Sequence, residues 1–186
     1  FELLRDNGYQ PIGMDHYAKP DDELALALRN KTLHRNFQGY ATQEKTGQVD
    51  AFGTTGISQL ASGYSQNARS LRSYKRAIDK GNLPVLRGYK LNQTEQVRRK
   101  VLNEVMCNHY LDFQDVADEF AITPSEVRKM VEYEPSKLKN FVEDGLVECD
   151  TDQVKVTPKG FFLIRNIAMT FDPMLSNKEN QYSKTI

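Results

Sequence analysis

The second half of the chain carries closely spaced signals for helix starts and for a hairpin. Thr123-Pro124-Ser125-Glu126 has the pattern of a capping box with proline at the first helical position, which predicts that a helix begins here. Residues 146–149 and 153–156 alternate apolar and polar side chains across a short polar turn, as the two strands of a hairpin do. Helices followed by a hairpin and a further helix is the order of a winged-helix-like bundle, so we expect that arrangement.

Further helices are predicted on both sides of these signals. Thr94 is expected to cap one helix, and Asp112 is expected to open another that runs through residue 120. A further helix covers 135–144 and ends at Gly145, and the last helix starts at Thr157. Together these elements predict a mainly helical domain.

The first half of the chain has weaker and more varied patterns. Residues 9–14 are a strand candidate, and residues 32–62 lose helical periodicity, which favours strands and loops. Asn67 is expected to cap a basic helix that runs to residue 80 and ends at Gly81. Residues 82–91 contain a proline and a glycine and are expected to form an extended connector.

These patterns divide the chain into two domains and a tail. The boundary is expected near 91–94, with one domain over 1–91, the helical domain over 92–172 and a polar tail over 173–186. The chain opens at Phe1 in what looks like the last turns of a helix that Gly8 ends, without a preceding N-cap. We therefore expect a piece cut from a longer protein.

Charge argues against nucleic acid as the partner of the helical domain. Residues 94–172 carry 15 acidic and 10 basic side chains, whereas affinity for phosphate backbones depends on lysine and arginine. Within this domain the expected recognition helix offers Arg128 and Lys129 but also Glu126 and Glu132. Packing or a lid is therefore the favoured use of this fold.

A basic helix face in the first half allows two interpretations. Arginine and lysine recur between Arg69 and Lys80, and such a run is usually a solvated surface. The same cations would suit the carboxylates or phosphates of an anionic small molecule. Arg69, Arg72 and Arg76 are therefore candidate substrate-binding residues.

The chain lacks the patterns of a metal site or a nucleophile. It has neither CxxC nor HExxH, and Cys107 and His109 are too close in sequence to share a helix face. Cys107 and Cys149 are expected to be small packed side chains, and two cysteines fit a reducing cytoplasm. We predict no catalytic and no metal-ligating residue in this chain.

Two further features allow more than one function, and the sequence excludes a membrane-spanning helix. Gly53-x-x-Gly56 lacks the lysine of a phosphate-binding loop, so it is either a tight turn or a close approach to a ligand. Asp15-His16-Tyr17 follows a strand and is either a functional loop or a capping turn. No apolar run approaches the ~20 residues that cross a bilayer.

A set of collinear motifs identifies a family resemblance. The longest run is Ile12-Gly13-Met14-Asp15-His16-Tyr17-Ala18-Lys19-Pro20-Asp21-Asp22-Glu23-Leu24, followed by Arg35-Asn36-Phe37-Gln38-Gly39-Tyr40. Shorter matches follow at Gln66-Asn67, Arg87-Gly88, Met106-Cys107-Asn108, Asp144-Gly145-Leu146 and Ile164-Arg165-Asn166-Ile167. Along nearly its whole length the chain resembles the bacterial oxygen-independent coproporphyrinogen III oxidases, radical S-adenosylmethionine enzymes of haem biosynthesis.

The resemblance implies a fold and an activity. The fold class is α+β, with residues 1–91 at the terminal edge of an incomplete (β/α) barrel and residues 92–172 forming the winged-helix-like cap. The family converts coproporphyrinogen III to protoporphyrinogen IX by radical oxidative decarboxylation of two propionates. It uses S-adenosyl-L-methionine, a [4Fe-4S] cluster held by a CxxxCxxC motif, and a reductant for that cluster. Because this chain lacks the motif, the fragment alone is expected to be inactive.

The resemblance also implies site residues. Positions matching Phe37, Gln38 and Ile57 belong to the second S-adenosylmethionine site of the family. The chain departs from the family pattern at Thr55-Gly56, next to Ile57, where Ser-Ala is usual, and at Tyr17, where phenylalanine is usual. A non-catalytic module that binds haem, another tetrapyrrole or nucleic acid is the alternative function.

Overall fold

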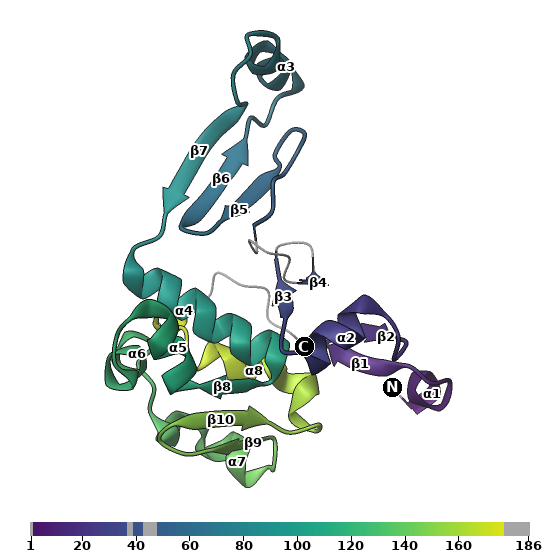
Figure 1. The fold of residues 1–186 in the computed structure, drawn as a ribbon, viewed down its shortest axis with the longest axis vertical. Helices are drawn as coiled ribbons and strands as arrows, with labels where there is room; N and C mark the ends of the chain where they lie inside the picture. Colours follow the sequence, from purple (N-terminus) through teal and green to yellow (C-terminus); the bar gives the residue numbers. More distant parts are fainter. Residues whose placement is uncertain (1, 37–38, 43–47, 177–186) are drawn as a thin grey trace.

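The protein is described by a computed structural model that covers residues 2–36, 39–42 and 48–176 (Figure 1). Its first part consists of short paired strands and two helices: α1 (Glu2–Asp6), β1 (Gln10–Gly13), β2 (His16–Ala18), α2 (Glu23–Arg29), β3 (Leu33–Arg35) and β4 (Tyr40–Thr42). β1 pairs with β2 and β3 pairs with β4, both antiparallel. Ile12, Ala25 and Leu33 form a small core with Cys107 from the second half. The predicted strand at 9–14 and the helix end at Gly8 are confirmed.

The second part is a three-stranded antiparallel sheet that carries one helix. β5 (Ile57–Leu60), β6 (Gly63–Asn67) and β7 (Val85–Lys90) follow one another in the sheet, and α3 (Leu71–Asp79) connects β6 to β7. In Figure 1 the sheet extends away from the helical part, with α3 at its far end. No residue of α3 is buried, and every residue of β7 is exposed.

One prediction for this part is wrong and another is incomplete. Asn67 ends β6 instead of capping a helix, and Ser70 is the residue whose side chain accepts the capping hydrogen bond of α3. Residues 82–91 are extended as predicted, but they contain the strand β7, because β6 provides a hydrogen-bonding partner that local sequence does not indicate. The predicted helix end at Gly81 is confirmed by its left-handed backbone, with φ of 72°.

The third part is mainly helical. Its helices are α4 (Gln93–Asn103), the π-helical segment η1 (Glu104–Asn108), α5 (Phe113–Phe120), α6 (Pro124–Met130), the 3₁₀ turn η2 (Pro135–Leu138), α7 (Lys139–Glu143), the 3₁₀ turn η3 (Gly160–Leu163), α8 (Ile164–Met169) and α9 (Pro173–Ser176). Its strands are β8 (Tyr110–Asp112), β9 (Val147–Cys149) and β10 (Gln153–Val156), with β10 in the centre. None of the helices in the described residues combines the length and apolar composition that a membrane crossing requires.

The helix starts at Asp112 and Thr123 and the hairpin of β9 and β10 are confirmed. The cap at Thr94 is wrong, because the helix is capped two residues earlier, where Asn92 forms a reciprocal capping box with Glu95. The expected helix over 135–144 is divided into η2 and α7.

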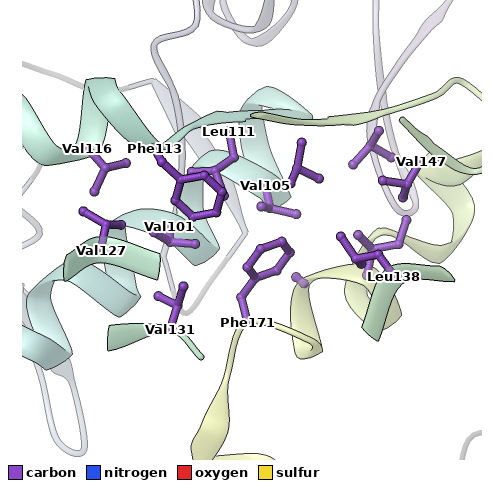
Figure 2. Packing of buried hydrophobic residues seen from close by; sticks show 14 of the residues in the cluster. Val101, Val105, Leu111, Phe113, Val116, Val127, Val131, Leu138, Val147 and Phe171 are labelled. Carbon is purple, nitrogen blue, oxygen red and sulfur yellow. The ribbon is translucent and has the colours of Figure 1, made fainter. Parts of the chain in front are cut away.

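One hydrophobic core holds the third part together. Its buried side chains all lie between Val97 and Phe171, and Figure 2 shows them contributed by the helices and by the small sheet. Phe113 and Phe171 are fully buried, and each ring contacts Tyr133. The mixed helix and sheet class is confirmed, whereas the barrel edge, the winged-helix assignment and the domain boundary stay predictions.

Candidate ligand-binding site

Ile57, at the start of β5, lines a hollow of about 500 Å³, which we call the β5 hollow. The loop of residues 49–56 supplies most of its other walls, and Gln59 and Asn36 complete the lining. Phe37 and Gln38, the other two residues expected at this site, lie outside the described residues.

The loop around the β5 hollow is held by a buried asparagine. Asn67 is 5% exposed, and its Nδ2 donates hydrogen bonds to the carbonyl oxygens of Ala51 and Gly53, each at 3.0 Å. The backbone N–H of Asn67 also donates to the carbonyl of Gly56 at 2.9 Å. These bonds satisfy the buried side-chain amide of Asn67. They also fix the position of the loop, which has no regular helix or strand of its own.

Gly56 allows the loop to fold tightly beside Ile57. A Cβ atom at this position would lie 3.1 Å from the Cβ of Ala51 and 3.1 Å from the carbonyl oxygen of Phe52, closer than side chains normally pack. Thr55 has a left-handed backbone with φ of 61°. The departure from the family pattern at Thr55-Gly56 therefore lies in the wall of the hollow.

A second hollow of about 430 Å³ lies beside α4, and we call it the α4 hollow. Side chains at helical spacing on one face of α4 form its largest wall: Glu95, Arg98, Arg99, Leu102 and Asn103. The remaining lining comes from the end of β3, from the sheet, from Leu91 and Met106 at the two ends of α4, and from residues 172 and 174. Asn36 and Gln59 line both hollows, so the two are adjacent.

A polar cluster connects these hollows to the helical part. His34 lies between two side-chain amides: its Nδ1 is 2.7 Å from Asn103 Nδ2, and its Nε2 is 2.9 Å from the terminal amide of Gln59. Asn103 Oδ1 accepts hydrogen bonds from the Arg35 N–H and the Cys107 thiol, so the NH₂ group of Asn103 faces His34.

The side-chain amides of Asn103 and Gln59 both turn their nitrogen toward the ring of His34, Asn103 Nδ2 toward Nδ1 and Gln59 Nε2 toward Nε2. A neutral ring accepts a hydrogen bond at one nitrogen, so it accepts from one of these two amides. Burial lowers the pKa of His34, and the charges of Arg99 and Lys100 lower it further, which favours this neutral ring. The Gln59 side chain thus lies against His34, between the two hollows.

The basic residues expected to bind substrate lie elsewhere. Arg72 and Arg76 are on α3, Arg69 precedes it, and all three are exposed. None of the three lines the β5 hollow or the α4 hollow. The structure therefore separates these cations from Ile57, and their role as substrate-binding residues stays a prediction.

Asp15 and His16 form a pair at the turn between β1 and β2, with 3.0 Å between Asp15 Oδ1 and His16 Nδ1. A hydrogen bond from its own backbone amide lowers the pKa of Asp15, and the bond to His16 lowers it further. The His16 ring packs edge-on against Tyr40, with 5.1 Å between ring centroids. Neither residue lines the two hollows.

The described residues do not offer ligands for an iron–sulfur cluster. They contain no group of three histidine, cysteine or acidic side chains that would hold a metal ion. Cys107 is fully buried, and burial raises the pKa of its thiol to about 12. Cys149 is in the strand β9 of the small sheet. A cluster does not fit these residues.

Several residues of the hollows were missed in the sequence. Gln59 follows Ile57 by two positions and so shares a strand face with it, which is a signal that could have identified it. Arg98 and Asn103 lie on the α4 face opposite to Val97 and Val101, which are buried in the core. No sequence signal connects His34 with Asn103, because 69 positions separate them.

Comparison with known proteins gives one consistent result. Residues 91–163 match the family model described as the HemN C-terminal domain. The chain is 42% identical over 179 residues to an oxygen-independent coproporphyrinogen III oxidase of Synechocystis, an alignment that covers 96% of the chain and 38% of the relative. It is 39% identical over 189 residues to the protein of the same name from Escherichia coli, covering 99% of the chain and 40% of the relative.

A solved structure agrees with these relatives. Coproporphyrinogen III oxidase (HemN) from Escherichia coli, described as a radical SAM enzyme, superposes with a TM-score of 0.81 at 37% sequence identity. The superposition covers 93% of this chain and 39% of that one. The chain thus spans about two fifths of the length of the proteins that it matches.

Proposed function

We propose that this chain, which is similar along its whole length to oxygen-independent coproporphyrinogen III oxidases, is the C-terminal part of such an enzyme. The observation that carries the proposal is identity of 39–42% over 96% or more of the chain to several proteins of that name. The complete enzyme would convert coproporphyrinogen III to protoporphyrinogen IX by oxidative decarboxylation of two propionates, in haem biosynthesis in the cytoplasm.

The part described here would shape the active site rather than supply its redox centre. Because a [4Fe-4S] cluster does not fit the described residues, its ligands and its reductant would act in the part of the enzyme outside this chain. We therefore expect the chain alone to have no oxidase activity.

Each part of the chain would have a structural role. Residues 1–91 would complete the edge of the incomplete barrel, residues 92–172 would form a winged-helix-like cap, and 173–186 would be a tail. The order of α4, β8, α5, α6 and the hairpin of β9 and β10 supports the winged-helix assignment, with β8 paired to β10. DNA binding has less support, because Arg128 of α6 is paired with Asp152.

The β5 hollow would hold the second S-adenosylmethionine. Ile57 lines it, and Phe37 and Gln38 follow Asn36, which also lines it. An aliphatic wall with nearby amide and hydroxyl groups suits an adenosyl group, and a volume of about 500 Å³ is in the range of small-molecule pockets. When bound, S-adenosylmethionine supplies the radical that removes hydrogen from a propionate. Arg69, Arg72 and Arg76 stay proposed contacts for substrate carboxylates outside this hollow.

Replacement of Ile57 tests the proposal. In the complete enzyme we expect Ile57→Asp to lower decarboxylation at least about tenfold, because a misplaced adenosyl group loses its reactive geometry. Val142→Asp, at an exposed valine of α7 that lines neither hollow, is the control and should keep near wild-type activity. Product is measured by chromatography, and the iron–sulfur absorption spectrum is recorded for both variants. Equal activity of Ile57→Asp and wild type would refute this site.

A further inference from the structure

The α4 hollow combines an apolar lining with arginines from two separate elements. Leu102, Met106 and Met174 line it, together with Arg35 from the end of β3 and Arg98 from α4. Both arginines are half-buried. A site of this kind suits a molecule whose skeleton is apolar and whose side chains are anionic.

The guanidinium groups of these two arginines are not neutralised by the described residues. None of the ion pairs formed within the described part of the chain includes Arg35 or Arg98. Arg35 contacts the sulfur of Met14 at 3.9 Å and lies over the ring of Tyr40, at 5.3 Å from its centroid. Arg98 donates from Nε to the carbonyl of Met130 at 2.7 Å, which orients its side chain and leaves its terminal nitrogens available.

Arg99 has a different role in the same wall. Its two terminal nitrogens donate to the carbonyl oxygens of Leu60, at 3.0 Å, and of Ala61. These bonds join α4 to the turn between β5 and β6. Arg99 therefore stabilises the shape of the hollow, whereas Arg35 and Arg98 have N–H groups that can donate hydrogen bonds to a ligand.

The acidic side chains that line the α4 hollow already accept hydrogen bonds from other groups. Glu95 accepts hydrogen bonds from the Tyr89 hydroxyl and from the Asn92 N–H, the latter at 2.9 Å. Those two bonds, the one from Tyr89 foremost, lower the pKa of Glu95. Asp172 accepts from the Met174 N–H at 3.0 Å. The charge of Arg98 also lowers the pKa of Glu95, but neither acid forms an ion pair with Arg35 or Arg98, so both guanidinium groups would meet an incoming carboxylate.

We propose that the α4 hollow binds a propionate side chain of the tetrapyrrole substrate, with Arg35 and Arg98 as the residues that hold its carboxylate. This inference rests on the proposed function. A guanidinium group binds a carboxylate with two parallel hydrogen bonds, and the apolar lining accommodates the methylene groups and the edge of the pyrrole. Gln59 and Asn36, shared with the β5 hollow, place this carboxylate beside the adenosyl site.

Equilibrium binding to the complete enzyme tests the proposal. The probe is coproporphyrin III, the oxidised and fluorescent form of the substrate, which carries the same propionates and does not turn over. We expect Arg35→Gln and Arg98→Gln each to weaken its binding roughly tenfold, because each removes a charge-assisted hydrogen bond. Arg98→Lys should lie between wild type and Arg98→Gln, since it keeps the charge without the planar donor pair.

A matched control is Arg128→Gln, which removes a half-buried arginine of the helical part outside the hollow and should leave porphyrin binding unchanged. Binding of S-adenosylmethionine is measured on every variant by calorimetry, because its methionyl group also carries a carboxylate. Weaker binding of S-adenosylmethionine with unchanged porphyrin binding would overturn the proposal. Unchanged binding of both, with a lower unfolding temperature, would assign the arginines to a carboxylate of the enzyme itself and would also overturn it.

The same experiment separates this inference from the proposed function. A folded wild-type enzyme that binds coproporphyrin III but does not decarboxylate coproporphyrinogen III would contradict the proposed function and leave the subsite standing. A wild-type enzyme that is active, with Arg35→Gln and Arg98→Gln unaffected in binding, would contradict the subsite alone.

Discussion

The helical part and the sheet that carries α3 differ most in what they bury. All the side chains of the main core lie between Val97 and Phe171, and they come from α4 through the last helices (Figure 2). In contrast, α3 buries no side chain and β7 is exposed along its whole length. The sheet is held mainly by hydrogen bonds between its strands, whereas the helical part excludes water from a packed interior. We infer that the stability of this chain resides in the helical part.

The candidate ligand site lies where these two regions meet. Gln59 comes from the sheet, Asn103 and Arg98 come from α4, and His34 comes from the first part of the chain. Side chains from three parts of the chain thus form one polar cluster beside the two hollows. Substitutions that move these regions relative to one another would therefore change the geometry of the site, even at residues that do not touch a ligand.

The largest expected effect is loss of a core ring. Phe113→Ala should lower the free energy of unfolding by about 3–5 kcal/mol, because it leaves a cavity in a closely packed core. Phe52→Ala removes a ring that is 91% exposed, and it should change that free energy by less than about 0.5 kcal/mol. Urea unfolding followed by far-UV circular dichroism suits this comparison, since the chain has no tryptophan. Similar losses from both variants would contradict the difference between the regions.

A smaller effect is expected from pH through His109. Burial lowers the pKa of His109 from 6.5 to about 4, so the folded state binds fewer protons than the unfolded state between these values. The stability from the neutral ring is complete above pH 6.5 and decreases by roughly 3 kcal/mol as the pH falls to 4.

The contribution of His109 is isolated by a variant. Its backbone is left-handed, with φ of 56°, which asparagine tolerates, so His109→Asn is the matched substitution. We expect the difference in unfolding free energy between wild type and His109→Asn to shrink as the pH falls from 7 to 4. A difference that stays constant with pH would show that His109 does not titrate in this range.

The smallest effect compares one helix cap from each region. Thr123 caps α6 and Ser70 caps α3, each by accepting a hydrogen bond from the backbone N–H three residues later. Thr123→Ala should lower the unfolding free energy by about 1 kcal/mol. Ser70→Ala should leave it nearly unchanged and instead speed hydrogen exchange within α3, because that helix opens separately from the core. A loss of similar size from both variants would mean that the sheet and the core unfold as one unit.

Local signals were sufficient for much of the secondary structure. The capping box at Thr123 marks the start of α6, and Gly81 marks the end of α3. Both signals depend on residues only three or four positions away, and the structure confirms both helix ends. The hairpin of β9 and β10 was also predicted, since its strands alternate across a short turn. The prediction of Asn67 as a helix cap was wrong, because its side chain binds the carbonyls of Ala51 and Gly53 instead.

The candidate site was only partly accessible from the sequence. The motifs indicate the family resemblance, and with it Ile57 as a ligand residue, a role that stays a prediction although Ile57 does line a hollow. Tertiary structure decided that Arg35 and Arg98 line one hollow and that His34 meets Asn103 across 69 positions. The physical reason is range: capping and strand alternation are set by neighbours along the chain, whereas a hollow and a buried hydrogen-bond cluster exist only once distant segments have packed together.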